Sequence, residues 1–558
     1  MADAPPPTGE ALILFNRAVF HHGRNEFPDA VTLYQQVVAL RPDLAPVRNN
    51  LAVALRDLGR ITDSLACCRA AIALKPDYAQ AYNNLGTALQ ALNPVPATPA
   101  TTGTDAARTA YRRAITLIPD YAQAYNNLGN VLRESDQTEQ AAAALRRAIT
   151  LMPDLPEAYD NLATTTLDAG AFDTAVAICR RSTLVRPGHA ESFSDLGMAL
   201  QSSGHPDAAL TAYRQAVTLN PENTQIHFNR ATALLQAGQY REGWAEYEWR
   251  RRTAIDVALA RPYDQPEWTG DRLDGRTILL YTEQGFGDTL MWARFVPLVA
   301  AQGGSIVLQV YPLLARLMRG LPVDVDVVDL SPTDRHFDTH LPLMTLPHRL
   351  GIGLDNLPAT VPYLRPDPAM ATAWRVRLAG LSGLKVGLVW AGAARIGNRA
   401  ANRIDRWRSI ALARLAPLAA VPGIAWVSLQ MGAAAAEAGM PPAGMTLLDW
   451  TEELTDFADT AALIDALDLV ITVDTAVAHL AGALGKPVWI LSRYNGCWRW
   501  LNDRDDSPWY PTARLFRQPR MGDWDTVITQ VRDQLDHLAL ARQAARAAPA
   551  PRSTIPQP

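Results

Sequence analysis

Cysteine is scarce in this sequence, with only four residues among 558. None of the four has the spacing of a metal site or of a redox pair. Cys67 and Cys68 are adjacent on an expected helix, where two neighbouring side chains do not readily pair with each other. We therefore expect reduced, packed thiols rather than a disulfide framework or a zinc site.

Long apolar runs and basic clusters are also lacking. No stretch approaches the ~20 apolar residues of a membrane-spanning helix, and the first ten residues, MADAPPPTGE, do not resemble a secretory signal. The formal net charge is −4, and Lys and Arg form no long basic run, so the sequence gives no footprint for nucleic acid. These absences predict a cytoplasmic protein with no membrane span and no nucleic-acid partner.

Proline, in contrast, recurs with a fixed period. Six prolines lie 34, 43, 34, 34 and 34 residues apart: Pro42, Pro76, Pro119, Pro153, Pro187 and Pro221. A 34-residue unit with Leu-Gly early, Ala midway and Pro at its end is typical of tetratricopeptide repeats, which are helix–turn–helix units that stack to bury their apolar faces. We expect a helical solenoid over residues 1–260. The long interval predicts a loop inserted at about residues 93–105, because its Pro and Gly residues interrupt helices.

One polar position repeats as regularly as the apolar core. Eight residues after each proline stands Asn in five units and Asp in the sixth: Asn50, Asn84, Asn127, Asn161, Asp195 and Asn229. First helices line the concave surface of such a stack, so a row of amides could bind the backbone of an extended peptide from an acceptor protein. The alternative is that these side chains serve helix stacking. The segments AYNNLG and AYDNLA resemble the repeats of the protein O-linked N-acetylglucosamine transferases.

After residues 240–250, which we expect to cap the solenoid, and a linker at 261–275, short apolar runs alternate with helical patterns. Strands are expected at 277–282, 305–310, 325–330, 337–341, 385–390, 424–429, 469–473 and 487–491. Helices are expected at 288–301, 313–319, 412–419, 457–467 and 475–484. This alternation predicts two α/β, Rossmann-like domains, at residues 276–375 and 376–540, with a ligand cleft at the carboxyl ends of their strands. The Ala/Pro-rich segment 541–558 is expected to be a disordered tail.

Two turns of this region contain candidate functional residues. The first, EQGFGD, follows the strand at 277–282, and its glycines, Gly285 and Gly287, allow a ligand to approach the backbone of a helix that starts near Asp288. In the second, Asp474 and Thr475 begin a helix whose free N–H groups could bind a diphosphate. His479 lies one turn further on the same helix. The alternative for both segments is an ordinary capped helix.

Together, the motifs GFGDTL and VDTAVAHLAGALGKPV resemble those of the lipopolysaccharide heptosyltransferases, which have the GT-B fold. The resemblance covers residues 276–535. It implies that Asp288 is a general base and that the second motif contacts a nucleotide diphosphate through Asp474, Thr475, Ala476 and His479. It also implies that no metal is needed, because GT-B enzymes generally work without a bound metal. No cofactor is implied either, since the nucleotide sugar is a substrate.

The sequence departs from that family between residues 390 and 409, where the family uses a lysine for phosphate. The chain has no lysine there. Instead the segment is rich in arginine, a residue that binds phosphate through two parallel hydrogen bonds. The candidate phosphate-binding residues are Arg395, Arg399, Arg403 and Arg408. A solvated surface loop is the alternative. Further on, residues 498–510 combine aromatic and charged side chains that could stack a base or a sugar, or seal two domains together.

The sequence therefore predicts an α-solenoid followed by a GT-B glycosyltransferase of hexosyl or heptosyl type. It would move a sugar from a nucleotide-diphosphate donor to a hydroxyl group, with inversion, on a protein selected by the repeats. Two alternatives stay open. The acceptor could be a lipid-linked or polysaccharide glycan, or the chain could be an interaction scaffold with a degenerate, non-catalytic transferase domain.

Overall fold

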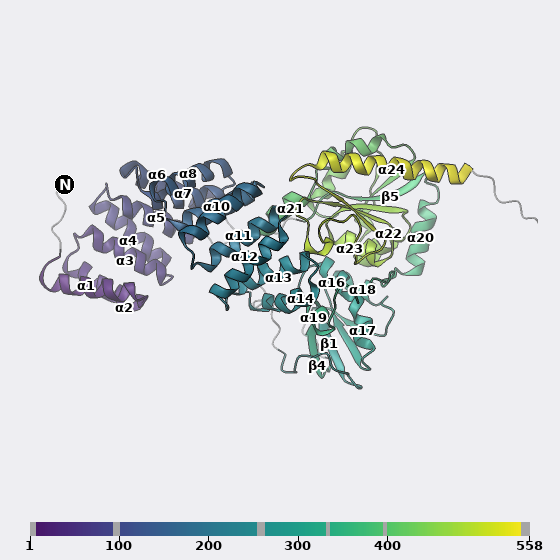
Figure 1. Cartoon of the computed structure of the whole chain (residues 1–558), viewed down its shortest axis with the longest axis horizontal. Helices are drawn as coiled ribbons and strands as arrows, with labels where there is room; N and C mark the ends of the chain where they lie inside the picture. Colours follow the sequence, from purple (N-terminus) through teal and green to yellow (C-terminus); the bar gives the residue numbers. More distant parts are fainter. Residues whose placement is uncertain (1–6, 93–100, 254–262, 331–334, 394–398, 548–558) are drawn as a thin grey trace, which may run out of the picture. The chain divides into compact units, whose positions relative to one another are not determined.

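The computed structural model describes residues 7–92, 101–253, 263–330, 335–393 and 399–547 (Figure 1). The chain divides into two compact units, Met1–Ser203 and Gly204–Pro558, which are described separately. None of the described helices combines the length and the apolar content that a membrane crossing requires. All four cysteines are free, as expected, and burial raises the pKa of Cys68 to about 12.

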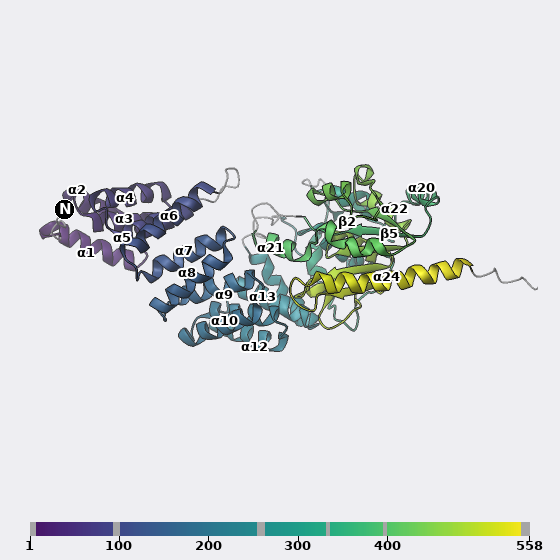
Figure 2. The same cartoon turned by 90° about the horizontal axis from the view of Figure 1, so that it is seen from above.

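The first unit is a stack of helix pairs (Figure 2). Its helices are α1 Gly9–Gly23, α2 Phe27–Leu40, α3 Ala45–Asp57, α4 Ile61–Leu74, α5 Ala79–Ala91, α6 Thr101–Leu117, α7 Ala122–Glu134, α8 Thr138–Leu151, α9 Pro156–Asp168, α10 Phe172–Val185 and α11 Ala190–Ser202. The glycine of the Leu-Gly pair lets paired helices approach closely. A Cβ atom on Gly86 would lie 2.6 Å from the ring of Tyr111, and one on Gly129 would lie 2.5 Å from Cγ of Leu145.

The inserted segment is shorter than the sequence predicted. Residues 93–100 lie outside the described part, but α6 already begins at Thr101, inside the loop expected at 93–105. The last proline of the segment is Pro99, and Gly103 costs a helix only about 1 kcal/mol relative to Ala. The helix can therefore start two residues after the proline.

The second unit begins with repeat-like helices and continues into two parallel sheets. The helices are α12 Pro206–Leu219, α13 Thr224–Gln236 and α14 Tyr240–Tyr247, followed by the 3-10 turn η1 Glu248–Arg252. The first sheet has the strand order β3-β2-β1-β4. Its strands are β1 Thr277–Tyr281, β2 Ser305–Gln309, β3 Asp326–Val328 and β4 Thr339–Pro342, and the helices of this region are α16 Phe286–Trp292, α17 Val296–Ala300, α18 Pro312–Met318 and α19 Leu346–Arg349.

The second sheet has the order β10-β9-β8-β5-β6-β7. Its strands are β5 Leu384–Val389, β6 Ile424–Ser428, β7 Leu447–Leu448, β8 Leu469–Val473, β9 Val488–Ser492 and β10 Ala513–Arg517. Counted from β5, this is the 3-2-1-4-5-6 order of a doubly wound nucleotide-binding sheet, in which ligands bind where the order reverses. That point lies between β5 and β8. The predicted α-solenoid followed by an α/β region is confirmed.

Helices surround the second sheet: α20 Pro368–Leu378, α21 Arg399–Arg408, α22 Phe457–Asp465, α23 Ala476–Ala483 and α24 Trp524–Ala547 (Figure 1). Two sequence predictions need correction here. The segment expected as an α-helix at 412–419 is a 3-10 helix with Pro417 inside it. The expected disordered tail starts too early, because α24 continues to Ala547 through the good helix formers Ala, Arg and Gln.

Candidate functional site

Two short helices from the two sheets meet face to face at the candidate site. Helix α16 follows β1 and carries Asp288, while α23 follows β8 and carries His479. Gly285 precedes α16 as its N-cap residue. A Cβ atom on Gly287 would lie 2.9 Å from Cδ2 of His479, so the second glycine of EQGFGD is needed for the two helices to pack. The structure thus brings the two sequence motifs together.

The carboxylate of Asp288 forms an ion pair with Arg499, and both side chains are largely buried, with 17% and 13% of their surfaces exposed. The guanidinium of Arg499 also donates to Sγ of Cys497 at 3.0 Å and lies 4.2 Å from the centre of the Trp498 ring. Burial is the largest single effect and lowers the pKa of Arg499, but the charge of Asp288 together with Cys497 and Tyr247 outweighs it, so the pKa lies well above the ordinary value. The sequence of residues 498–510 indicates a surface that stacks a base or a sugar or seals two domains together, but it does not predict that Arg499 pairs with Asp288.

His479 is buried in an aromatic environment. Its Nδ1 atom is 2.9 Å from the hydroxyl of Tyr510, and its ring stacks on Trp500 at 5.1 Å. Burial, with a smaller contribution from Arg499, lowers the pKa of His479 to about 4. The side chain is therefore neutral at physiological pH and adds no positive charge to the site.

The turn between β8 and α23 differs from the expected cap. Thr475 is the N-cap residue of α23, but its hydroxyl makes no capping hydrogen bond and instead lies 3.1 Å from the hydroxyl of Thr472. The carbonyl of Asp474 accepts a hydrogen bond of 2.8 Å from Nη1 of Arg408. This bond joins the carboxyl end of β8 to helix α21, across the point where the strand order reverses.

The arginine-rich segment is partly helical rather than a loop. Arg395 lies outside the described residues, and Arg399 begins α21 with a side chain that is also outside them. Arg403 and Arg408 lie further along α21, where the Nε and Nη2 atoms of Arg408 donate to Asp405 at 3.0 and 2.9 Å. The helix fixes the guanidinium of Arg408 beside Asp474.

A further arginine, which sequence reasoning missed, follows strand β9. Burial lowers the pKa of Arg493, and the positive charges of Arg408 and Arg403 lower it further, whereas Asp474 acts in the opposite direction. Its Nε atom is buried and has no hydrogen-bond partner among the described residues. Arg493 thus lies close enough to Arg403, Arg408 and Asp474 to interact with their charges at this edge of the sheet. Such a group of cations suits a multiply charged anion. In the sequence, the only indication of this role is that Arg493 directly follows an apolar strand.

In the solenoid, the repeated amides make hydrogen bonds between repeats. Three of the five asparagines in the row donate from Nδ2 to an asparagine one repeat earlier: Asn84 to Asn49 at 2.8 Å, Asn127 to Asn83 at 3.0 Å and Asn161 to Asn126 at 2.9 Å. These bonds support the stacking alternative for the row. The side chains remain half-buried, so the peptide-binding role of the row stays a prediction.

The row changes character at its last two members. Asp195 and Asp160 occupy the positions that correspond to the bonded pairs Asn84–Asn49 and Asn161–Asn126 of other repeats. Two carboxylates therefore stand where those repeats have two amides. Burial, and then the charges of Asp160 and Glu191, raise the pKa of Asp195 to about 7. Asn229 belongs to the second unit, where its Oδ1 atom accepts from Gln225 at 2.8 Å.

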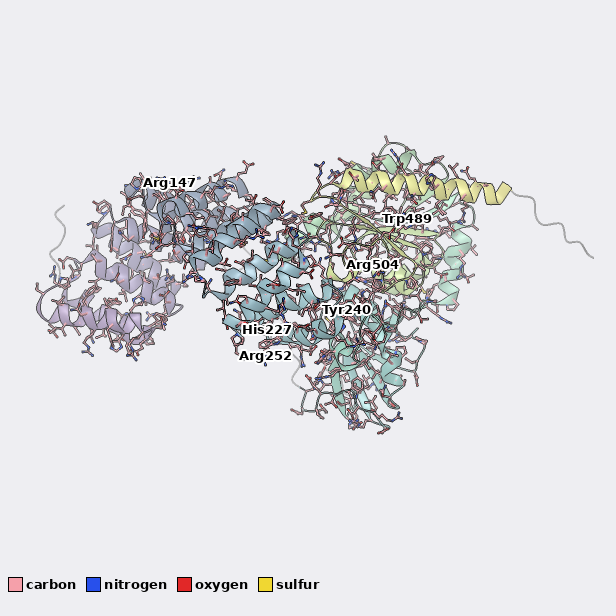
Figure 3. The ribbon with its side chains drawn as sticks, in the orientation of Figure 1. Arg147, His227, Tyr240, Arg252, Trp489 and Arg504 are labelled. Carbon is pink, nitrogen blue, oxygen red and sulfur yellow. The ribbon has the colours of Figure 1, made fainter. Side chains whose placement is uncertain are left out.

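The terminal repeat helices pack directly against the candidate site. Arg250, which has no exposed side-chain surface, bonds Glu283 of the EQGFGD turn at 2.8 Å and Thr345 at 2.8 Å. Tyr240, labelled in Figure 3, accepts a hydrogen bond of 3.0 Å from Nε1 of Trp509. Trp244 packs edge-on against Trp292, Trp498 and Trp509. The sequence predicted that residues 240–250 cap the solenoid, and these contacts attach the same residues to the surroundings of the candidate site.

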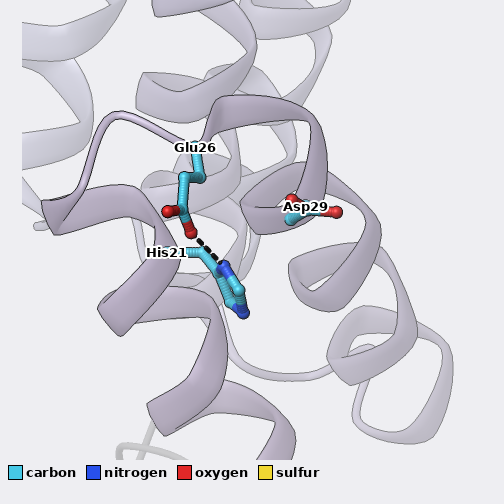
Figure 4. A group of neighbouring side chains, drawn as sticks. All are labelled: His21, Glu26 and Asp29. Carbon is cyan, nitrogen blue, oxygen red and sulfur yellow. Dashed lines mark hydrogen bonds and ion pairs between the residues drawn. The ribbon is translucent and has the colours of Figure 1, made fainter.

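Far from this site in sequence, one surface group has a metal-like composition (Figure 4). Ligand atoms of His21, Glu26 and Asp29 lie within 4.8 Å of one another, and Nδ1 of His21 is 2.6 Å from Glu26. Asp29 is exposed and the other two are half-buried. Ion pairs of this kind are common at protein surfaces, so the group is not assigned as a metal centre.

Comparisons with known proteins match both halves of the chain. Tetratricopeptide repeat families match residues 53–93, 104–135, 122–155 and 194–248. Glycosyltransferase family 9 (heptosyltransferase) matches residues 453–493, which contain β8, α23 and the arginine after β9. Protein FlbA of Caulobacter vibrioides is 30% identical over 347 residues, covering 56% of this chain and 55% of FlbA, so the chain matches only about half of that relative's length.

Solved structures of repeat proteins are also similar. YrrB, described as a TPR protein with an unusual peptide-binding site, is 21% identical and covers 35% of this chain and 95% of its own, with a TM-score of 0.28. TTC0263 of Thermus thermophilus is 20% identical and covers 40% of this chain and 99% of its own, with a TM-score of 0.29. By the family matches, the chain carries tetratricopeptide repeats in its N-terminal half, and a segment towards its C-terminal end matches glycosyltransferase family 9 (heptosyltransferase).

Proposed function

We propose that this chain transfers a sugar from a nucleotide-diphosphate donor to a hydroxyl group of an acceptor. The observation that carries the proposal is the coincidence of two features at one edge of the second sheet. The segment that matches glycosyltransferase family 9 contains the turn at Asp474, and the arginines of α21 and of the β9 end gather around that turn. This edge is also where doubly wound sheets bind nucleotides.

The donor diphosphate would lie at this arginine cluster. Arg403, Arg408 and Arg493 supply positive charge, and the N–H groups at the start of α23 point towards the same turn. Negative charge develops on the diphosphate as the bond to the anomeric carbon breaks, and fixed cations stabilise it. Arginine remains charged throughout, so it can fill the role that the heptosyltransferases give to lysine.

Asp288 would assist the acceptor. Its carboxylate takes the proton of the acceptor hydroxyl while that oxygen forms a bond to the anomeric carbon, and the diphosphate leaves with the electron pair of the broken bond. Attack from the face opposite the leaving group inverts the anomeric carbon. The repeats would select a protein acceptor, while a glycan acceptor remains the alternative within the same chemistry.

Nucleotide release from a panel of nucleotide sugars tests this function. We expect the purified chain to release nucleotide with at least one donor, and Asp288→Ala to reduce release by ~10²-fold or more, the contribution typical of a general base. Asp324→Ala, at an exposed position of the same domain, is the matched control and should behave as the wild type. Donor binding without release, or release unchanged in Asp288→Ala, would favour the non-catalytic scaffold.

A further inference from the structure

Several contacts besides the ion pair with Asp288 fix the side chain of Arg499. It belongs to the 3-10 turn η7 Trp498–Trp500, whose two tryptophans are buried. The carbonyl of Trp500 accepts a hydrogen bond of 2.5 Å from Arg517. The guanidinium is confined between Asp288, the sulfur of Cys497 and the Trp498 ring. It therefore has little freedom to leave Asp288.

The backbone next to this turn is strained. Leu501 has φ 52° and ψ −174°, a conformation that is essentially restricted to glycine, and Asp503 also has a positive φ of 52°. A leucine persists in such a conformation only where the surrounding contacts fix it. Strain of this kind concentrates at functional sites, and here it lies two residues from the cation that contacts Asp288.

The terminal repeat supplies one of the contacts that fix this loop. Gln236 is the last residue of α13 and is buried, with 6% of its surface exposed. Its Nε2 group donates to Oδ1 of Asn502 at 3.0 Å and to the carbonyl of Gly496 at 3.3 Å. These two acceptors flank Arg499 on both sides along the chain. A helix of the repeat type thus anchors both ends of the loop.

We infer that Arg499 is a positioning residue for Asp288 and that Gln236, from the terminal repeat, holds the Arg499 loop in place. This inference rests on the proposed function. Arg499 Nη2 binds Oδ1 of Asp288, while no described residue hydrogen bonds to Oδ2, so that oxygen is left for the acceptor hydroxyl. Arginine has no acceptor atoms and is not deprotonated in proteins, so it orients the carboxylate without competing for the proton.

The physical consequence is a fixed lone-pair direction at the base. Proton transfer requires the base within hydrogen-bond reach of the hydroxyl, and a misplacement of about 1 Å can cost ~10²-fold in rate. Donor binding depends on the separate arginine cluster around Asp474. Loss of Arg499 should therefore reduce the rate of the chemical step more than it reduces donor affinity.

The test compares Arg499→Met, Arg499→Lys and the control Arg504→Met in the full-length chain. Arg504 lies in the same loop, and its side chain pairs with Asp506 instead. We expect Arg499→Met to lower kcat by ~10-fold or more, with a donor KM within about threefold of the wild type. Arg499→Lys should retain more of the kcat, added guanidine hydrochloride should partly restore Arg499→Met, and Arg504→Met should match the wild type.

A second variant tests the role of the loop that carries Arg499 without changing Arg499 itself. Gln236→Leu removes both hydrogen bonds to the loop and should lower kcat several-fold while leaving the donor KM near the wild-type value. This variant also keeps the inference falsifiable if Arg499→Met does not fold. An unchanged kcat in Gln236→Leu then overturns the inference.

The outcomes separate the two claims. No turnover by the wild-type chain with any donor overturns the proposed function, and the inference with it. Wild-type turnover that is unchanged in Arg499→Met overturns the inference alone. A higher donor KM with normal kcat at saturation would make Arg499 a donor-binding group, and a lower kcat without rescue by lysine or guanidine would make its role structural. Both results also overturn the inference.

Discussion

At the scale of single residues, Asp195 and Asp160 place two carboxylates where three preceding pairs of repeats have amides that bond to each other. Burial raises the pKa of both, and Ser182 opposes the shift of Asp160 with a hydrogen bond of 2.9 Å. Neighbouring groups on the packed helices include His189, which lowers the pKa of Asp160, and Glu191, which raises that of Asp195. The folded chain therefore favours a proton on this pair.

The first prediction concerns Asp195→Asn, which restores the amide of the row. The folded pKa of Asp195 is about 7 against an ordinary 3.8, so stability is lost as the pH rises from 4 through 7. The variant should be more stable than the wild type at pH 8, by at most about 4 kcal/mol, and should gain little at pH 4.

Hydrogen exchange in α9 and α11 at pH 5 and pH 8 measures this effect locally. Asp154→Asn, an exposed change in the same unit, is the control and should show no such dependence. Equal protection of Asp195→Asn and the wild type at pH 8 would mean that the two carboxylates do not share a proton.

The second prediction concerns His479, whose pKa is depressed to about 4 from an ordinary 6.5. The unfolded chain binds a proton between these values and the folded chain does not, so stability present above pH 6.5 is lost as the pH falls towards 4. The loss should reach at most about 3 kcal/mol. His479→Gln should flatten the dependence of the unfolding temperature on pH in this range, and a slope equal to that of the wild type would argue against a buried neutral imidazole.

At the scale of elements, the sequence predicted most helices and strands because their signals are local. The Leu-Gly pairs and the apolar runs of β1, β5 and β8 each occupy a few consecutive residues, and the 34-residue period repeats one such local pattern along the chain. Helix α21 was not predicted, because its many Arg residues were interpreted as a phosphate-binding or solvated loop, although Ala400, Ile404 and Trp407 recur at helical spacing. The roles of Arg493 and Arg499 were not predictable either. They depend on contacts with Asp474 and Asp288, and the second pair lies 211 residues apart in sequence.

A third prediction tests how closely the helices of one repeat pack. Gly129→Ala would place a methyl group 2.5 Å from Leu145 and 3.2 Å from the carbonyl of Ala141, so α7 and α8 must separate. Overpacking of this kind costs typically 1–3 kcal/mol. Gly188→Ala, where no atom lies within 4 Å of the new methyl group, is the control. Thermal unfolding should show a clearly lower melting temperature for Gly129→Ala than for Gly188→Ala. Similar melting temperatures would contradict the close packing of α7 and α8.

At the scale of the whole molecule, the chain divides between Ser203 and Gly204, inside the repeat region, rather than at the end of the repeats. From the sequence we expected the solenoid to extend to residue 260 and the sheets to begin at residue 276, because the 34-residue repeat there gives way to alternating strands and helices. Contacts such as Gln236 to Asn502 join residues 266 positions apart, and no local pattern reveals them. The terminal repeat helices are therefore part of the compact unit that carries the candidate site.

The fourth prediction follows from this division. A fragment of residues 204–558 should fold and bind the same donors as the full chain, because it keeps Trp244 and Arg250. A fragment of residues 261–558 leaves the buried Glu283 without its partner Arg250, and loss of one partner of a buried ion pair costs about 3–5 kcal/mol. Circular dichroism and thermal unfolding compare the fragments, and equal stability of the two would show that the terminal repeat is dispensable.

The anomeric configuration of the product tests the central claim most directly, because a single displacement assisted by Asp288 fixes the stereochemical result. Proton NMR of a turnover mixture, with the donor that gives nucleotide release, identifies the configuration of the newly formed glycoside. We expect it to be opposite to that of the donor. Retention of configuration, or nucleotide release without any glycoside product, would contradict this account of the site.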